Sequence, residues 1–253
     1  MTVQSRIALI TGGSRGIGRS TVEALARRGV SSIFTYNRNS DAADDVVAEA
    51  KKLGVRAIAI QLDTGRTAAF PDFVANLRST LAEWGAERLD FLVNNAGTSH
   101  HAPIIDVTEA DFDALFLVHV KGVFFLTQAV LPLIADGGRI VNISSALTRV
   151  AYPGSTAYAS MKGAVEVMTR YMAKELGERR ITANVVAPGA VQTDFSGGIV
   201  RDNPEINRHI SELTALGRPG LPEDIGSMIA VLLSADNRWV NAQRIEVSGG
   251  MVI

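Results

Sequence analysis

The chain has 253 residues, of which 47% are hydrophobic and 20% are charged, and its formal net charge is −1. This length suits one large domain, and a near-neutral chain without long runs of one sign argues against nucleic-acid binding or a polybasic membrane surface. The absence of cysteine excludes disulfides and thiolate metal sites. Only one short apolar run precedes Gly12, and no apolar stretch approaches the ~20 residues that span a bilayer. We therefore expect no signal peptide, no membrane partner and a cytoplasmic location.

Short apolar runs alternate along the chain with longer segments of helical periodicity. We expect strands over Ile7–Thr11, Ser32–Thr35, Arg56–Leu62, Leu89–Val93, Arg139–Ser144, Thr182–Val186 and Arg244–Val247. We expect helices near Gly16–Arg28, Asp41–Leu53, Ala68–Trp84, Asp111–Val130, Thr156–Gly177 and Glu223–Leu233. This alternation predicts an α/β fold of one domain over residues 1–253, a Rossmann-type doubly wound parallel β-sheet with helices on both faces.

The segment Ala190–Pro219 has no clear periodicity. It directly follows a predicted strand, and in this fold ligands bind beyond the carboxyl ends of the strands. We therefore expect residues 190–219 to form a lid over a substrate, with a surface excursion or a subunit contact as the alternative.

A glycine-rich turn joins the first predicted strand to the first predicted helix. Residues Thr11–Gly18 read T-G-G-S-R-G-I-G. Glycines allow a tight turn and a close approach to a ligand, and the following helix N-terminus offers free N–H groups to a pyrophosphate. The turn predicts a dinucleotide site.

Tyr158 and Lys162 stand four residues apart in a predicted helix, so both side chains leave the same face. A nearby ammonium favours the phenolate, and we expect it to lower the pKa of Tyr158 from its usual value near 10. Such a phenol can give a proton to a carbonyl oxygen or take one from an alcohol.

Together the glycine turn and the Y-x-x-x-K pair resemble the short-chain dehydrogenase/reductase family. Four further segments match its pattern, so the resemblance runs from Ile7 to about Gly250. These segments are Asn94–Gly97 (N-N-A-G), Ser145 thirteen residues before Tyr158, Pro188-Gly189 followed by Thr193, and Val247–Gly250.

The resemblance implies an NAD(P)-dependent oxidoreductase of the EC 1.1.1 type that interconverts a carbonyl and an alcohol. It assigns proton transfer to Tyr158, a hydrogen bond to the substrate oxygen to Ser145, and support of Tyr158 and the nicotinamide ribose to Lys162. The cofactor-binding residues that it implies are Gly12, Ser14, Arg15, Gly16, Ile17, Gly18, Tyr36, Asn37, Arg38, Asp63, Thr64, Asn94, Ala96, Gly97, Tyr158, Lys162, Pro188, Gly189, Val191 and Thr193.

The end of the second predicted strand indicates which dinucleotide binds. An acidic residue there holds the ribose of NAD, but Tyr36 occupies that position and the next carboxylate is Asp41. Arg15 and Arg38 could clamp a 2′-phosphate through charge-assisted hydrogen bonds, although both could also be solvated surface arginines. We expect NADP(H) to be preferred over NAD(H).

One position departs from the family pattern. Where many members have Asn in V-N-x-K-G, this chain has His119. That Asn usually holds a water in a proton relay to the catalytic lysine. Either the imidazole of His119 replaces the amide in the relay, or the relay is impaired.

Two alternative functions remain open from the sequence. A non-catalytic dinucleotide-sensing protein would keep the fold, although it would not need Ser145, Tyr158 and Lys162. A reductase similar to the 3-oxoacyl carrier-protein reductases would need a basic docking surface, to which Arg149 and Arg170 could contribute.

The family is commonly tetrameric, and the sequence favours such an assembly. The predicted helices Asp111–Val130 and Thr156–Gly177 are apolar on more than one side, and the tail Met251–Ile253 is apolar. We expect a homotetramer that acts on a small molecule. We assign no metal site, because His100, His101 and His209 lack recognisable partner ligands.

Overall fold

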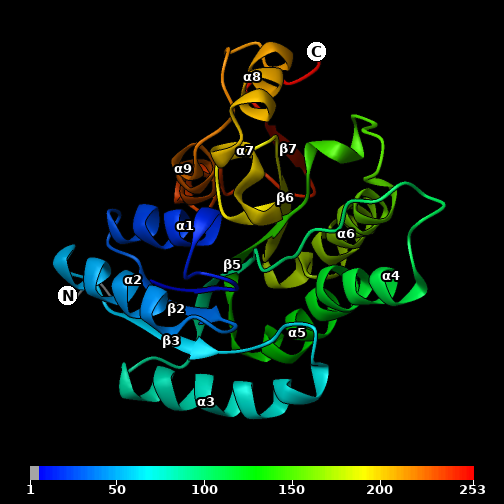
Figure 1. Cartoon of the computed structure of the whole chain (residues 1–253). Helices are drawn as coiled ribbons and strands as arrows, with labels where there is room; N and C mark the ends of the chain where they lie inside the picture. Colours follow the sequence, from blue (N-terminus) through cyan, green and yellow to red (C-terminus); the bar gives the residue numbers. More distant parts are fainter. Residues whose placement is uncertain (1–5) are drawn as a thin grey trace.

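The computed structural model describes residues 6–253 and confirms the doubly wound fold (Figure 1). One seven-stranded sheet has the order β3-β2-β1-β4-β5-β6-β7, and every neighbouring pair is parallel. The strands are β1 (Ile7–Ile10), β2 (Ser31–Tyr36), β3 (Ala57–Gln61), β4 (Leu89–Asn94), β5 (Ile134–Ile143), β6 (Thr182–Pro188) and β7 (Arg244–Val247). The order reverses between β1 and β4, and a crevice at such a point is where this architecture binds ligands.

Helices cover both faces of the sheet. They are α1 (Gly16–Ala26), α2 (Ser40–Lys52), α3 (Phe70–Glu83), α4 (Glu109–Phe116), α5 (Gly122–Val130), α6 (Thr156–Glu175), α7 (Ile199–Asp202), α8 (Pro204–Leu213) and α9 (Pro222–Leu232). The short helical turns are η1 (Thr67–Ala69), η2 (Leu117–Lys121), η3 (Leu131–Leu133), η4 (Ala146–Thr148), η5 (Gly177–Arg179), η6 (Phe195–Gly198) and η7 (Ala235–Asn237).

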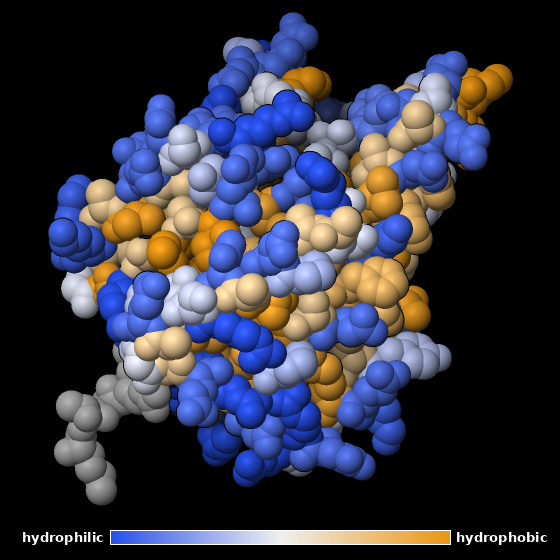
Figure 2. Space-filling view, turned by 90° about the horizontal axis from the view of Figure 1, so that it is seen from below, coloured by the Kyte–Doolittle hydropathy of each residue, from blue (hydrophilic) through white to orange (hydrophobic). Residues whose placement is uncertain are grey.

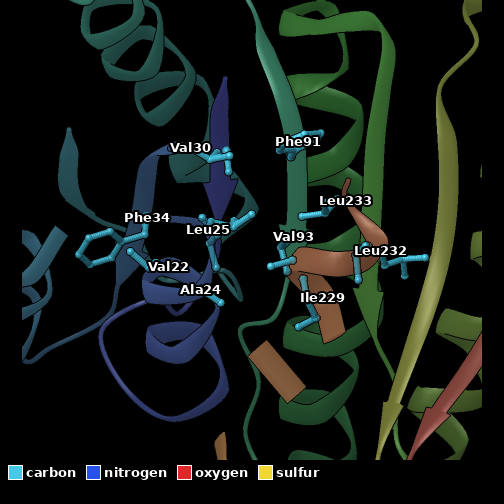
Figure 3. Packing of buried hydrophobic residues seen from close by; sticks show 14 of the residues in the cluster. Val22, Ala24, Leu25, Val30, Phe34, Phe91, Val93, Ile229, Leu232 and Leu233 are labelled. Atoms are coloured by element: carbon cyan, nitrogen blue, oxygen red, sulfur yellow. The ribbon is translucent and has the colours of Figure 1, made fainter. Parts of the chain in front are cut away.

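Alternate residues of each strand point into two separate cores. Ala8 and Ile10 of β1 pack with α1, α2 and α9, whereas Ile7 and Leu9 pack with α3, α5 and α6. Figure 3 shows the first core, where Val22 and Leu25 of α1 lie near Val93 of β4 and the α9 residues. Because both faces of each central strand are buried, the strands need continuous apolar runs rather than alternating ones.

One sequence-based expectation about helices needs correction, and the segment 190–219, whose elements the sequence did not indicate, also contains helices. The helix expected over Asp111–Val130 is divided into α4, the π-helical turn η2 and α5. The expected lid at 190–219 contains η6, α7 and α8, whose cap residue Asn203 accepts hydrogen bonds from the backbone N–H groups of Glu205 and Ile206. Figure 1 shows α7 and α8 beside the C-terminus, and the N–H of Val252 donates to the carbonyl of Leu213 at 2.9 Å.

The expectation that no segment is long and apolar enough to span a bilayer also needs correction. Within residues 6–253, one continuous helical segment, Glu109–Leu133, is long and apolar enough to cross a bilayer, with a mean hydropathy of 1.8 in its most apolar window. A count of uninterrupted apolar residues in the sequence does not detect this segment, because polar residues lie within it. Its residues Leu126, Val130 and Leu133 pack into the second core of the sheet, and core helices of this kind satisfy the same length and composition test.

Candidate active site

The residues expected to be functional gather at the carboxyl ends of β1, β4, β5 and β6. Thr11 follows β1, Asn95 follows β4, Ser145 follows β5 and Pro188 ends β6. Because these strands are parallel neighbours, side chains from segments more than 170 residues apart meet at one edge of the sheet.

Steric constraints explain the glycines of the turn after β1. Gly12 and Gly16 have φ angles of +66° and +54°, in the left-handed region that favours glycine. A Cβ at Gly18 would lie 2.0 Å from the carbonyl oxygen of Gly12. The turn can therefore bring its backbone and the N-terminus of α1 close to a ligand, and Gly16-Ile17-Gly18 form the first turn of that helix.

Asn95 and Thr11 hold this turn in place, and our sequence reasoning missed both as site residues. The Asn95 amide nitrogen donates to the carbonyls of Thr11 and Gly12 at 2.9 and 3.1 Å. The Thr11 hydroxyl accepts from the N–H groups of Asn95 and Ala96, both at 2.9 Å. The signal was in the sequence, since each residue belongs to one of the quoted motifs.

The side chain of Asn94 is buried within the fold, deeper than contact with a ligand would require. Its side-chain nitrogen donates to Thr127 Oγ1 at 3.0 Å and to Asn142 Oδ1 at 2.8 Å, which uses both of its hydrogens inside the fold. Among the described residues, the Asn94 Oδ1 atom has no hydrogen-bond partner. The expected role of Asn94 and Gly97 at the cofactor ribose stays a prediction.

Ser145, Tyr158 and Lys162 meet above the end of β5. Ser145 caps η4, and the N–H of Leu147 donates to its Oγ at 3.2 Å, so the hydroxyl keeps its own proton for another partner. Tyr158 and Lys162 lie in the first two turns of α6, with the Lys162 Nζ 5.6 Å from the centroid of the Tyr158 ring. Lys162 Nζ donates to the carbonyl of Ile143, the last residue of β5, at 2.8 Å.

Burial controls the protonation of this pair. It raises the pKa of Tyr158, although a hydrogen bond from Ser145 opposes the shift, and it lowers the pKa of Lys162 to about 7. The expected fall in the pKa of Tyr158 below its usual value is therefore not found in this structure, because desolvation raises it. A phenol that keeps its proton is suited to act as an acid.

His119 is buried against Tyr158. It lies in the π-helical turn η2, is 1% exposed, and meets the Tyr158 ring edge-on with a centroid distance of 5.3 Å. Its Nε2 lies 2.7 Å from the carbonyl oxygen of Thr98 and 3.3 Å from the backbone nitrogen of the same residue, and the shorter contact favours the neutral tautomer with the proton on Nε2. Its Nδ1 is buried and has no hydrogen-bond partner among residues 6–253. Burial and the charge of Lys162 lower the pKa of His119 to about 3.

The residues expected around the adenosine lie at the ends of β2 and β3. Tyr36 ends β2, and the next residue, Asn37, accepts a hydrogen bond from Gln61 Nε2 at 2.8 Å. Asp63 accepts from the N–H of Gly65 at 2.9 Å, so its carboxylate stabilises the turn after β3. Thr64 in this turn is buried and so is Ser14 of the glycine turn, whereas Arg15 and Arg38 are exposed.

The segment after β6 closes over the glycine turn. A Cβ at Gly16 would lie 3.3 Å from the Thr193 methyl group, which places Thr193 directly against the start of α1. Pro188 ends β6, Gly189 packs tightly on Ser248, and Val191 pairs with Gly220.

The start of the lid also reaches Tyr158. The Phe195 ring lies 6.1 Å from the Tyr158 ring, centroid to centroid. Three successive residues, Ser196, Gly197 and Gly198, have φ angles of +56°, +70° and +79°, which form a sharp bend before α7. Arg201 binds both Asp194 and Asp202, so an ion-pair cluster ties α7 to the residues before the bend.

Comparisons with known proteins identify relatives that match almost the whole chain. Residues 12–252 match the family model described as enoyl-(acyl carrier protein) reductase. The hydroxynaphthalene reductase-like protein Arp2 of Metarhizium brunneum is 36% identical over 262 aligned residues, which cover 99% of this chain and 96% of Arp2.

Two solved structures extend the comparison to the fold. The promiscuous reductase LugOII, which catalyses keto-reduction at C1 during lugdunomycin biosynthesis, has a TM-score of 0.94 at 38% identity, with 100% of both chains covered. The angucycline C-6 ketoreductase LanV, crystallised with bound NADP, has a TM-score of 0.93 at 37% identity, with 98% of this chain and 96% of LanV covered.

The buried His119 makes stability depend on pH. Its pKa is lowered from 6.5 to about 3, so between these values the unfolded chain binds a proton that the folded chain does not. The free energy of unfolding should therefore fall as the pH is lowered from 6.5, by up to about 1.4 kcal/mol per pH unit more than in a His119→Asn variant. Urea unfolding of both proteins between pH 6.5 and 4.5 measures the difference. His209→Asn on α8 controls for the loss of an exposed imidazole, and parallel profiles for wild type and His119→Asn would contradict the burial of a neutral ring.

Proposed function

Because the chain belongs to the short-chain dehydrogenase/reductase family of oxidoreductases, we propose that it reduces a ketone to an alcohol with NADPH, and that Tyr158 supplies the proton. The observation that supports this most strongly is the grouping of Ser145, Tyr158 and Lys162 at one sheet edge, next to the glycine turn. The sequence pattern alone could not establish that these groups meet.

The residues present fit a dinucleotide. A Cβ at Gly18 would clash with the Gly12 carbonyl, the positive φ angles of Gly12 and Gly16 disfavour any side chain, and the N-terminus of α1 opens at the same point, as a pyrophosphate requires. When bound, NADPH supplies the hydride. Thr193 and the backbone at Val191 would hold the carboxamide of the nicotinamide, as the family resemblance implies.

In the reduction, negative charge develops on the substrate oxygen as the carbonyl carbon accepts the hydride. Ser145 donates a hydrogen bond to this oxygen. The N–H of Leu147 already donates to one lone pair of Ser145 Oγ, so the hydroxyl proton is left for the substrate. Tyr158 gives its proton to the same oxygen. Its raised pKa keeps the phenol protonated at physiological pH, so the proton is present on Tyr158 when the substrate oxygen needs it.

We propose that His119 takes the place of the usual asparagine in the relay that serves Tyr158, with its Nδ1 accepting a hydrogen bond rather than supplying the proton. Its unpartnered Nδ1 is an acceptor near Lys162, whose charge acts on the imidazole. The hydrogen bond between Nε2 and the Thr98 carbonyl fixes the ring so that Nδ1 stays available. If turnover against pH is unchanged in the His119→Asn variant, His119 takes no part in the relay.

The substrate class that we propose is a polycyclic aromatic ketone. Phe195 stands against Tyr158, and the ring of Tyr152 lies 6.1 Å from that of His101. The loop of His101 is tied to the segment before α6, since the N–H of Ala102 donates to the carbonyl of Gly154 at 3.0 Å. Such aromatic side chains suit a flat ligand, and the name of Arp2 refers to a hydroxynaphthalene, while that of LanV refers to an angucycline.

A carrier-protein substrate is less well supported. The Arg149 guanidinium, expected to contribute to a basic docking surface, instead binds Glu246 and the carbonyls of Met251 and Val252. Arg170 lies on α6 and donates to the Glu166 carbonyl of its own helix at 3.4 Å. Glu246 therefore offsets the charge of Arg149, whereas Arg170 is exposed, and one such arginine is a small basic surface.

We also propose that the enzyme works in the cytoplasm on a free small molecule. The absence of cysteine and the net charge of −1 are compatible with that compartment and favour neither nucleic acid nor an anionic membrane as a partner.

Replacement of Tyr158 by Phe tests the function directly. Removing the phenolic proton donor should lower ketone turnover by about 10²–10⁴-fold, while NADPH binding changes little. Steady-state reduction of aromatic ketones, together with NADPH fluorescence titration, measures both. Tyr152→Phe is the matched control and should retain turnover, because the ring remains. Equal turnover in Tyr158→Phe and wild type would exclude the proposed mechanism.

Cofactor preference depends on the two exposed arginines. If Arg38 binds the 2′-phosphate, Arg38→Leu should weaken NADPH binding by about 10–100-fold, the equivalent of one charge-assisted hydrogen bond, and leave NADH binding unchanged. Both nucleotides are titrated against wild type, Arg38→Leu and Arg28→Leu. Arg28 lies just beyond the C-terminus of α1, away from the glycine turn, so its variant is the control. An equal effect on the two nucleotides would place Arg38 outside the phosphate site.

We propose a homotetramer in solution. Large apolar side chains are exposed on α4, η2, α5 and α6, and Figure 2 shows apolar patches interrupted by polar ones on the face seen from the α3 side. The exposed residues on these helices are Phe112, Phe116, Leu117, Phe124, Phe125, Val167 and Tyr171. Partner helices would cover them.

Light scattering after gel filtration should give four times the chain mass for wild type. Phe124→Glu should reduce that mass, because the variant places a charge in the proposed contact. A monomeric wild type would contradict the proposal.

A further inference from the structure

A half-buried ionic cluster surrounds the turn that carries Ser145. Glu166 lies on α6 two turns beyond Tyr158, and its side chain is 14% exposed. A single oxygen of this carboxylate, Oε1, accepts from Ser144 Oγ at 2.7 Å, from Thr148 Oγ1 at 2.7 Å and from Arg244 Nε at 2.8 Å. Ser144 and Thr148 stand on either side of Ser145, so Glu166 holds both ends of the turn.

Arg244 provides a second hold on the same turn. Its Nη2 donates to Thr148 Oγ1 at 3.0 Å and to the Ser145 carbonyl at 3.3 Å. The planar guanidinium thereby joins the backbone of Ser145 to the carboxylate of Glu166. A charged fork of this kind fixes geometry better than isolated hydroxyls.

The cluster continues to the far end of the lid. Arg244 Nη1 donates to Glu246 at 3.0 Å, and Glu246 also binds Arg149, whose guanidinium donates to the carbonyls of Met251 and Val252. The same tail segment contacts the residues after α8. The carbonyl of Gly249 accepts a hydrogen bond from the N–H of Leu216, and Met251 forms an antiparallel β-bridge with Thr214. One chain of contacts therefore connects the Ser145 turn with the residues that follow α8.

We propose that Glu166, assisted by Arg244, is a positioning residue that fixes the Ser145 hydroxyl for catalysis. Neither residue touches the reacting atoms. Glu166 acts by fixing Ser144 and Thr148, which places the N–H of Leu147 where it occupies one lone pair of Ser145 Oγ. The hydroxyl proton is then directed at the substrate oxygen. This inference rests on the proposed ketone reduction.

A double-mutant cycle with Ser145 tests this role. Glu166→Ala should lower the single-turnover rate of ketone reduction by about 10–100-fold, the effect of a misplaced catalytic group, and should leave the Kd for NADPH within about 2-fold. In a Ser145→Ala background, the same substitution should cause no further loss, because the hydroxyl that it positions is gone. Enzyme in excess over substrate keeps slow rates measurable.

Two further variants make the result specific. Glu175→Ala removes an exposed glutamate from the end of the same helix. It should leave the single-turnover rate unchanged in both the wild-type and the Ser145→Ala backgrounds. Glu166→Gln keeps an oxygen that accepts from Ser144 and Thr148, so it should recover most of the lost rate, and it serves in the cycle if the alanine variant does not fold.

The outcomes separate this inference from the proposed function. If wild type reduces no ketone with NADPH, the proposed function fails before the cycle begins. If wild type is active but the losses from Glu166 and Ser145 are additive, or if folded Glu166→Ala keeps the wild-type rate, the positioning role is wrong and the reductase remains.

Discussion

The desolvated contact between Tyr158, Lys162 and His119 is the constraint on which the rest of the site depends. Placing a half-buried phenol beside a buried amine and a buried imidazole costs free energy, and desolvation shifts the pKa of each group towards its neutral form. Lys162 is partly compensated by its hydrogen bond to Ile143, and His119 by its contact with Thr98. The result is a phenol that keeps its proton beside the Ser145 hydroxyl, the arrangement on which the proposed reduction rests.

The sheet makes this costly arrangement possible. Lys162 is fixed because α6 packs on β5 and β6, whose buried apolar residues hold the helix in position. The glycine turn is fixed because Asn95 and Thr11 join the ends of β1 and β4. A site built on the ends of packed strands is more rigid than one built on loops, and the lid with its bend at Ser196–Gly198 contributes only one wall.

Local patterns in the sequence predicted much of the fold. Apolar runs separated by helical periodicity predicted every strand of the sheet, because each central strand is buried on both faces. The glycine turn and the Tyr158–Lys162 pair are contiguous motifs, so their spacing alone indicated their elements. The roles assigned to individual site residues stay predictions, since the structure brings them together without testing their chemistry.

Features that depend on tertiary contacts were not predictable. The π-helical turn that presses His119 against Tyr158 has no local signal, and neither does the burial that reverses the expected pKa shift of Tyr158. Arg149 looked like a free surface charge because its partner, Glu246, is 97 positions away. For the same reason the sequence did not indicate Glu166.

The most direct test of the central claim is a crystal structure of the enzyme with NADP⁺ and the alcohol product of an aromatic ketone. The account predicts that the product oxygen lies about 2.6–3.2 Å from both the Tyr158 and the Ser145 hydroxyls, with the carbinol carbon facing the nicotinamide. A product oxygen beyond hydrogen-bond reach of Tyr158, or hydroxyls of Tyr158 and Ser145 that point into separate cavities, would contradict it.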